Sequence, residues 1–150
     1  MIRWAHPDQD GDLYAEIIRF IGTRVWGADA LAPGGTAAGI FRNQAMVAGV
    51  AFHNWQPDFG TVELSCAGSG NWLTRGILSE VMGYAYGALK AQAVIMTMAH
   101  DNMAARSLCS KMGSKEYIIP RLMGRDKSMV IGVITSESWN ATGLERNGHG

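Results

Sequence analysis

The most regular pattern of polar and apolar positions in the chain begins at residue 61. Polar and apolar side chains alternate through Thr61–Cys66, which predicts a strand. Val62 and Leu64 lie on one face of this strand, and Glu63 lies on the other. The small residues Ala67–Asn71 end it and form a loop.

A helical pattern follows this loop. Apolar side chains recur three and four positions apart over a wide face, at Ile77, Leu78, Val81, Met82, Tyr84, Ala85, Ala88 and Leu89. The short apolar segment Val94–Met98 then predicts a buried strand. Because two strands joined by a crossover helix run parallel, these three elements predict a central parallel βαβ unit.

The N-terminal third predicts a helix, a loop and a hairpin. The helix follows the acidic cluster Asp8–Asp12, whose carboxylates are expected to cap its first turn, and Gly27 is its expected end. A loop covers Asp29–Thr36. Two strand-like segments come next, Ala38–Arg42 and Met46–Phe52, and the short polar turn Asn43-Gln44 joins them as a hairpin. A second turn is predicted over His53–Gly60.

The C-terminal third predicts one more helix and two strands. The helix begins at Asn102 and ends at Gly113, which is expected to adopt a left-handed conformation. The predicted strands are Lys115–Ile119 and Ser128–Ile134. Residues 137–150 are polar and are expected to form a loose tail on which Trp139 docks. We therefore predict a single α+β domain over residues 1–136, with a mixed, mostly antiparallel sheet flanked by helices.

Composition narrows the possible functions. The 150 residues include 13 Lys plus Arg and 13 Asp plus Glu, so no excess of positive charge is available to hold nucleic acid. Cys66 and Cys109 are 43 positions apart and have no metal-ligand spacing, which disfavours a zinc site and a disulfide scaffold. No apolar segment approaches the roughly 20 residues of a membrane span, and the N-terminus lacks a signal-peptide core, so a cytoplasmic protein is expected.

The loop between the first strand and the helix of the βαβ unit is a candidate anion site. Backbone N–H groups at a helix N-terminus favour negative charge, and Arg75 adds a cation to the loop Gly68–Gly76. Many such loops contain glycine and bind nothing. The loop has neither a Walker lysine nor a GxGxxG pattern, which disfavours nucleoside triphosphates and dinucleotides.

From Gly39 to Ile134 the sequence resembles the GNAT superfamily of acyl-CoA N-acyltransferases, and most of all the branch that acetylates protein N-termini. The resemblance is carried by the order of elements around Glu63, by the loop that ends in Trp72-Leu73-Thr74-Arg75-Gly76, and by the helix Asn102–Gly113 with its Asn-x-x-Ala-x-x-Leu-x-x-Lys-Met-Gly pattern. It implies an acetyl-CoA-dependent enzyme that needs no metal.

The resemblance also implies roles for individual residues. The main chain of Leu64, Ser65 and Cys66 would pair with the pantetheine arm and polarise the thioester carbonyl. The loop would hold the pyrophosphate through Trp72, Leu73, Thr74, Arg75, Gly76 and Ile77, and Asn102 would contact the cofactor near the reacting end. Cys109 stands where many members have a tyrosine that protonates the leaving thiolate, so it is either an acid or a buried packing residue.

The loop departs from the family pattern. Many members have Gln/Arg-x-x-Gly-x-Gly/Ala, whereas here only the last glycine remains, at Gly76. The backbone N–H of Thr74 still provides a donor for phosphate.

Acetyl transfer to an amine requires a group that takes the ammonium proton. Glu63 is the best candidate base, acting directly or through water; the alternative is a solvated or ion-paired glutamate on a strand. His53 and His100 are interpreted as structural histidines of turns, because a turn histidine without a fixed partner is more often structural than catalytic.

The expected function is therefore N-acetyl transfer from acetyl-CoA to a primary amine in a ternary complex. A protein N-terminus or a lysine is favoured over a small amine. The alternative is a GNAT-like binding or assembly module without catalysis, for example a viral structural component, because the loop is altered and the tyrosine is absent. A nucleic-acid-modifying acyltransferase would need a basic face built from Arg42, Arg75, Arg106 and Arg121.

Overall fold

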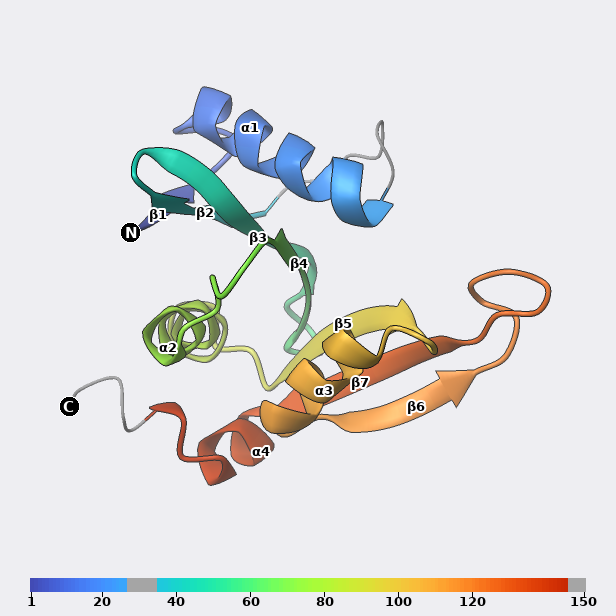
Figure 1. The fold of residues 1–150 in the computed structure, drawn as a ribbon. Coiled ribbons are helices and arrows are strands. Elements are labelled where there is room, and N and C mark those ends of the chain that lie inside the picture. The colour runs from blue at the N-terminus through green and yellow to red at the C-terminus, as the bar shows by residue number, and fades with distance from the viewer. Residues whose placement is uncertain (27–34, 146–150) are drawn as a thin grey trace. The chain divides into compact units, whose positions relative to one another are not determined.

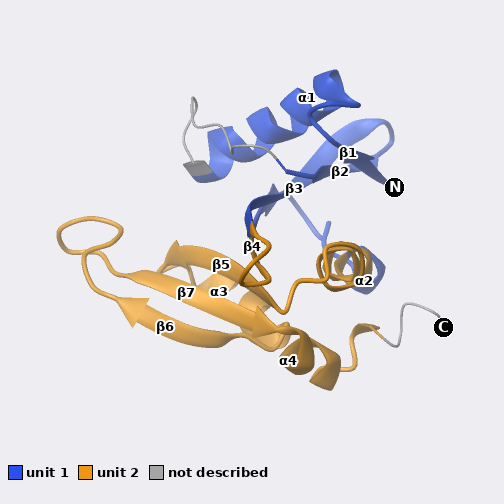
Figure 2. Ribbon diagram, turned by 180° about the vertical axis from the view of Figure 1, so that it is seen from behind, with its two compact units in different colours: residues 1–55, 63–77 blue, residues 56–62, 78–150 orange. Residues whose placement is uncertain are grey.

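The computed structural model of the chain describes residues 1–26 and 35–145. The predictions for Gly27, for most of the loop Asp29–Thr36 and for the last five residues of the tail lie outside the described residues. The chain forms two compact units, which Figure 2 shows in different colours. The first unit contains residues 1–55 and 63–77, and the second contains residues 56–62 and 78–150.

The first unit consists of antiparallel strands and one long helix (Figure 1). Its elements are β1 (Ile2–Ala5), α1 (Gly11–Ile21), a short π-helix (Gly22–Trp26), β2 (Ala37–Arg42), β3 (Ala45–Gln56) and most of β4 (Thr61–Gly68). β2 pairs antiparallel with β1 on one side and with β3 on the other.

Helix α1 packs closely on this sheet because two glycines face each other across β2 and β3. Gly39 pairs with Gly49 in the register of the two strands. A Cβ atom at Gly49 would lie 3.0 Å from Cγ1 of Ile21, and one at Gly39 would lie 3.3 Å from Cγ1 of Ile17. Both isoleucines are fully buried, so the absence of two side chains on the sheet lets the helix approach it.

The hairpin is confirmed, whereas the predicted turn after it is wrong in part. Asn43 and Gln44 both have positive φ, as a two-residue hairpin turn requires. β3, however, continues to Gln56, so His53 lies on a strand. Only the residues from Pro57 to Gly60 turn the chain.

The beginning of the chain differs from the sequence prediction in two further ways. β1 was not expected, because four residues are too few to show a pattern. The helix was expected and is present, but Asp10, its N-cap residue, makes no capping hydrogen bond with its side chain.

The second unit holds the other strands and helices. They are most of α2 (Arg75–Gly83), a short π-helix (Tyr84–Ala88), β5 (Ala93–Ala99), α3 (Met103–Lys111), β6 (Lys115–Ile119), β7 (Met129–Thr135) and α4 (Ser136–Ala141). β7 pairs antiparallel with β5 and with β6. The predicted elements from residue 75 to 135 are therefore confirmed in type and approximate extent.

The strand order is β1-β2-β3-β4-β5-β7-β6. β4 and β5 are neighbours in this order and are joined by α2, as the βαβ prediction requires. The residues that lead into β4 belong to the second unit, where the Gly60 carbonyl accepts hydrogen bonds from the N–H groups of Gln92 and Ala93, at 2.7 and 3.2 Å. The fold is thus the predicted α+β type with a mixed, mostly antiparallel sheet.

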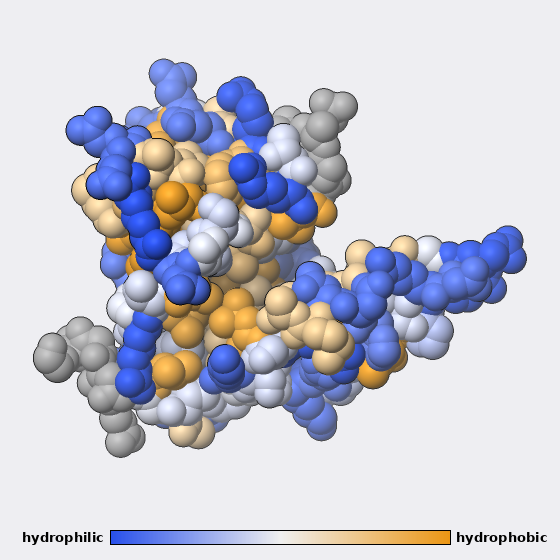
Figure 3. All heavy atoms as spheres, viewed as in Figure 1, coloured by the Kyte–Doolittle hydropathy of each residue, from blue (hydrophilic) through white to orange (hydrophobic). Residues whose placement is uncertain are grey.

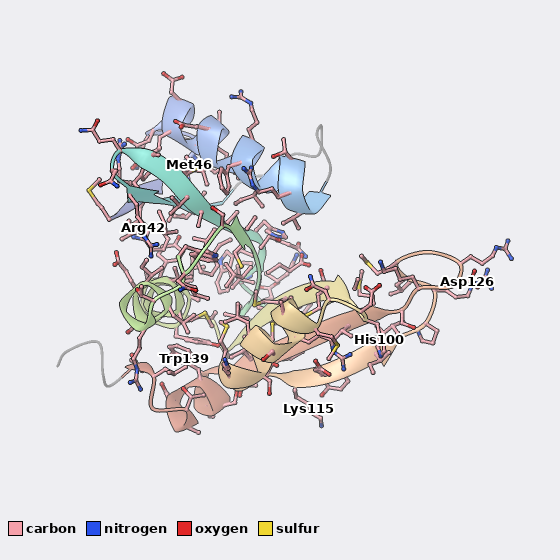
Figure 4. The ribbon with its side chains drawn as sticks, in the orientation of Figure 1. Arg42, Met46, His100, Lys115, Asp126 and Trp139 are labelled. Atoms are coloured by element: carbon pink, nitrogen blue, oxygen red, sulfur yellow. The ribbon has the colours of Figure 1, made fainter. Side chains whose placement is uncertain are left out.

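Helices α3 and α4 meet at Gly113. This residue has φ +90°, as predicted for a left-handed cap, and a Cβ atom there would lie 2.6 Å from the Ser138 carbonyl oxygen. Trp139 of α4 is 1% exposed, so it docks as predicted, but residues 136–141 form a helix rather than a loose segment. Trp139 is labelled in Figure 4.

No helix in residues 1–26 and 35–145 is long and apolar enough to cross a membrane. No group of three or more His, Cys, Asp or Glu side chains in those residues is arranged to hold a metal ion.

Candidate active site

Three polar side chains meet on strands β3 and β4 of the first unit. Glu63 and Ser65 are two positions apart on β4 and therefore project from the same face. His53 projects from β3, the neighbouring strand. Its Nε2 lies 2.9 Å from Ser65 Oγ, and its Nδ1 lies 3.8 Å from Glu63 Oε2. A carboxylate, an imidazole and a hydroxyl group are thus connected in that order.

The imidazole in this cluster is held in its neutral form. The His53 side chain is only 15% exposed, and burial lowers its pKa below 6.5, although the nearby charge of Glu63 acts in the opposite direction. Glu63 is 30% exposed. A neutral imidazole has one nitrogen that accepts a proton, so at neutral pH His53 is able to serve as a base.

The loop that follows β4 is fixed by three contacts within the first unit. Trp72 is buried against Gly68, where a Cβ atom would lie 2.4 Å from the indole Nε1. The Ser69 N–H donates to the Val47 carbonyl at 3.0 Å. Arg42, labelled in Figure 4, donates to the Asn71 carbonyl at 2.6 Å. The buried indole ring of Trp72 therefore anchors the loop on β4.

The first turn of α2 presents backbone N–H groups to its surroundings. Thr74 Oγ1 accepts from the N–H of Ile77 at 3.2 Å and so caps the helix. The N–H of Thr74 itself, which the sequence analysis assigned to phosphate, donates to the Trp72 carbonyl at 3.1 Å. The N–H groups of Arg75 and Gly76 precede the first intrahelical hydrogen bond, and both residues are exposed.

Two of the predicted site residues lie in the second unit. Asn102 is the N-cap of α3, and its Oδ1 accepts from the Ala105 N–H at 3.2 Å. Cys109 is 1% exposed, and its Sγ lies 3.6 Å from Met96 Sδ. Burial, together with the charge of Glu116, raises the Cys109 pKa to about 11. The thiol is therefore protonated at neutral pH.

The second unit also contains a tight ion pair. Arg106 donates from Nε to one carboxylate oxygen of Glu116 at 3.0 Å and from Nη2 to the other at 2.8 Å. These hydrogen bonds lower the pKa of Glu116 and raise that of Arg106. Such a bidentate pair holds both groups in one geometry.

The structure thus divides the predicted site residues between the two units. Glu63, the main chain of Leu64, Ser65 and Cys66, and the loop to Ile77 lie in the first unit, whereas Asn102 and Cys109 lie in the second. His53, which contacts both Ser65 and Glu63, was not among the predicted site residues. Pro57 and Gly60 suggested that His53 lies in a turn, and no spacing along the chain relates it to Ser65, twelve positions away.

Among the comparisons with known proteins, the one with solved structures identifies the fold. No protein-family model matches the chain, and no curated protein sequence matches it. Solved structures do match. A ribosomal-protein-alanine N-acetyltransferase from Brucella melitensis aligns over 90% of this chain and 99% of its own, with 18% identity and a TM-score of 0.67.

Two further structures extend this agreement. A chimera of the Vibrio cholerae spermidine N-acetyltransferase SpeG and hSSAT aligns over 94% of this chain and 99% of its own, at 13% identity and a TM-score of 0.73. A GCN5-related N-acetyltransferase from Brucella melitensis aligns over 99% of this chain and 80% of its own, at 15% identity and a TM-score of 0.66.

Other matched structures are longer, and this chain spans 63% and 66% of the length of two of them. At identities of 12–18% the likeness concerns the fold. The chain has the fold of the GNAT superfamily of acyl-CoA N-acyltransferases.

Proposed function

We propose that this protein transfers an acetyl group from acetyl-CoA to a primary amine. The observation that carries the proposal is the arrangement along one strand of the first unit. A half-buried glutamate lies on β4, and the loop at the end of that strand leads to exposed N–H groups at the start of α2. The GNAT fold of the chain and the acetyltransferase names of matched structures support the same chemistry.

In this proposal the residues of β4 and its loop hold acetyl-CoA. The N–H groups of Arg75 and Gly76 and the Arg75 guanidinium bind phosphate, because they are the exposed donors of the first turn. Thr74 contributes by capping that turn, since its own N–H is already bonded. Trp72 supports the loop, Leu73 and Ile77 flank it, and the main chain of Leu64, Ser65 and Cys66 pairs with the pantetheine arm.

The amine loses its proton to Glu63, directly or through a water molecule. Glu63 is suited to this role because it is partly exposed and contacts His53, whose pKa is lowered by burial, and not a permanent cation. Acetyl-CoA supplies the activated thioester. Asn102 is proposed as a cofactor contact and Cys109 as the acid for the thiolate, although the burial of Cys109 favours a packing role.

The acceptor is proposed to be a protein N-terminus or a lysine side chain. The residues from Ile119 to Lys127 carry Arg121, Arg125 and Lys127 against the single acidic residue Asp126, a balance that disfavours a polycationic acceptor. Figure 3 shows hydrophilic surface at the tip of this loop, and Figure 4 places Asp126 there.

Binding of acetyl-CoA to the folded protein tests the proposal. At 100 times its dissociation constant a ligand adds about 2.7 kcal/mol of stability, which for this chain length raises the melting temperature by roughly 5–10 °C. Arg75→Ala should reduce the shift, whereas Lys90→Ala, which changes an exposed cation in the second unit, should not. If millimolar acetyl-CoA produces no shift, the proposal is wrong. A positive shift is followed by a screen of peptide and small-molecule amines.

The second candidate function is a GNAT-like binding or assembly module without catalysis. The observation in its favour is the loop, where the Thr74 N–H is bonded to Trp72 and only Gly76 remains of the family pattern. Absence of acetyl-CoA binding would favour this function. A nucleic-acid-modifying enzyme is disfavoured, because Arg42 and Arg106, two of the four arginines it would need, are engaged with Asn71 and Glu116.

A further inference from the structure

We propose that Ser65 is a nucleophile, activated by His53 and positioned by Glu63, that accepts an acetyl group from an activated donor and passes it to water. With acetyl-CoA as the donor, the protein would hydrolyse the thioester when no amine is present. This activity differs from direct transfer to an amine, and with acetyl-CoA it rests on the proposed function.

The geometry of the first unit carries the inference. Nucleophilic catalysis by serine needs a base within hydrogen-bond distance of the hydroxyl and a third group that orients the base. His53 Nε2 is 2.9 Å from Ser65 Oγ, and Glu63 Oε2 is 3.8 Å from the other ring nitrogen. The carboxylate contact is longer than a hydrogen bond, as is common before a substrate closes the site.

Backbone geometry makes this arrangement a stable property of the sheet. Glu63 and Ser65 are separated by one residue on β4, so the pleat of the strand places both side chains on one face. His53 lies on the neighbouring strand β3, and its side chain is mostly buried. Burial also keeps the imidazole neutral at neutral pH, the form in which it accepts the hydroxyl proton.

The proposed reaction has two balanced steps. In the first, Ser65 Oγ attacks the acyl carbonyl carbon while its proton passes to His53 Nε2; the carbon–sulfur bond breaks, and the thiolate takes that proton to leave as a thiol. In the second, a water oxygen attacks the acetyl-serine carbonyl and loses a proton to His53 Nε2; the bond to Oγ breaks, and Oγ recovers the proton. The net change is thioester plus water to thiol plus acetic acid.

The test uses two donors and two readouts on the full chain. The protein is incubated without amine, once with acetyl-CoA and once with p-nitrophenyl acetate, which needs no coenzyme-binding loop. Release of thiol or nitrophenol is followed, and the peptide that contains Ser65 is examined by mass spectrometry for one added acetyl group. We expect hydrolysis of both donors, acetylation at Ser65, and a rate that rises with pH as His53 loses its proton.

Variants separate the proposed roles from a structural one. Ser65→Ala should abolish acetylation and lower hydrolysis to background, and His53→Gln should reduce the rate about 100-fold. Glu63→Gln should reduce it less. The exposed side chains of Ser110 and His100 provide matched controls, so Ser110→Ala and His100→Gln should hydrolyse both donors as the parent protein does. Each variant's unfolding curve is measured to verify that it folds.

The outcomes distinguish this inference from the proposed function. If acetyl-CoA raises the melting temperature but neither donor acetylates Ser65, the inference is overturned and the proposed function stands. If p-nitrophenyl acetate acetylates Ser65 in a His53-dependent manner while acetyl-CoA does not bind, the nucleophile is supported and the proposed function is wrong. Hydrolysis that persists in Ser65→Ala at the parent rate also overturns the inference.

Discussion

Glu63 and Glu116 both lie on strands beside a basic side chain, yet their surroundings differ. In the second unit, Glu116 receives two hydrogen bonds from Arg106, at 2.8 and 3.0 Å. In the first unit, Glu63 has a 3.8 Å contact with His53, whose pKa is lowered by burial. Glu116 is therefore committed to an ion pair with a permanent cation, whereas Glu63 faces an imidazole that is neutral at neutral pH.

This difference separates a structural carboxylate from one that is available for proton transfer. A bidentate arginine stabilises the ionised carboxylate, so accepting a proton there would break two charge-assisted hydrogen bonds. Glu63 has no arginine contact of this kind in the described part of the chain.

The two cysteine thiols of the chain show a similar contrast between the units. Cys66 on β4 is half-buried, whereas Cys109 on α3 is buried against Met96.

The largest expected effect is on the rate of acetyl transfer, when each of the two glutamates is replaced by glutamine in a separate variant. Glu63→Gln removes the proposed base and should lower the rate constant of acetyl transfer about 100-fold at neutral pH. Glu116→Gln weakens an ion pair away from the proposed chemistry and should leave that rate constant near the parent value. Both are measured with the amine identified in the acceptor screen. Unchanged turnover of Glu63→Gln across the pH range would show that Glu63 is structural.

A smaller effect is expected in the reactivity of the two thiols. With a pKa of about 11, roughly one Cys109 thiol in a thousand is ionised at pH 8, and the side chain is buried besides. Native protein treated with iodoacetamide should therefore be alkylated at Cys66 at least about tenfold faster than at Cys109. Peptide mass spectrometry measures both rates. In Cys66→Ser, labelling should await unfolding in urea; rapid native labelling would contradict the burial of Cys109.

Local sequence signals predicted most of the fold correctly. Asn43-Gln44 between two apolar segments indicated the hairpin, Asn102 indicated the start of α3, and Gly113 indicated its left-handed end. Each of these signals acts within a few residues, so spacing along the chain is sufficient to find it. β1 lacked such a signal because it is short, and it exists through its pairing with β2.

The candidate site was harder to predict because its contacts join distant residues. Glu63 was predicted as a base from strand alternation together with the family resemblance. His53 was assigned to a turn, since Pro57 and Gly60 signal a turn but do not fix the residue where the strand ends. The register between β3 and β4, which brings His53 to Ser65, and the hydrogen bond from Arg42 to Asn71, 29 positions apart, both depend on tertiary packing.

The smallest expected effect is a difference in the pH dependence of stability. The folded-state pKa is lowered in both His53 and Glu116, so each contributes stability that is present above its unfolded-state pKa and lost as the pH falls through its folded-state pKa. The unfolded-state values are about 6.5 for histidine and 4.5 for glutamate. As the pH falls, the stability that His53 contributes should therefore be lost at a higher pH than the stability that Glu116 contributes.

Melting temperatures of His53→Gln and Glu116→Gln, measured against the parent protein from neutral to acid pH, separate the two groups. As the pH falls below about 6.5 the parent should lose stability relative to His53→Gln, because protonation of the buried imidazole beside Glu63 favours the unfolded chain. Its advantage over Glu116→Gln should persist through this range and disappear only below about 4.5. If both advantages disappear together below 4.5, His53 is not held neutral by burial. The contrast between an imidazole free to accept a proton and a committed ion pair would then be lost.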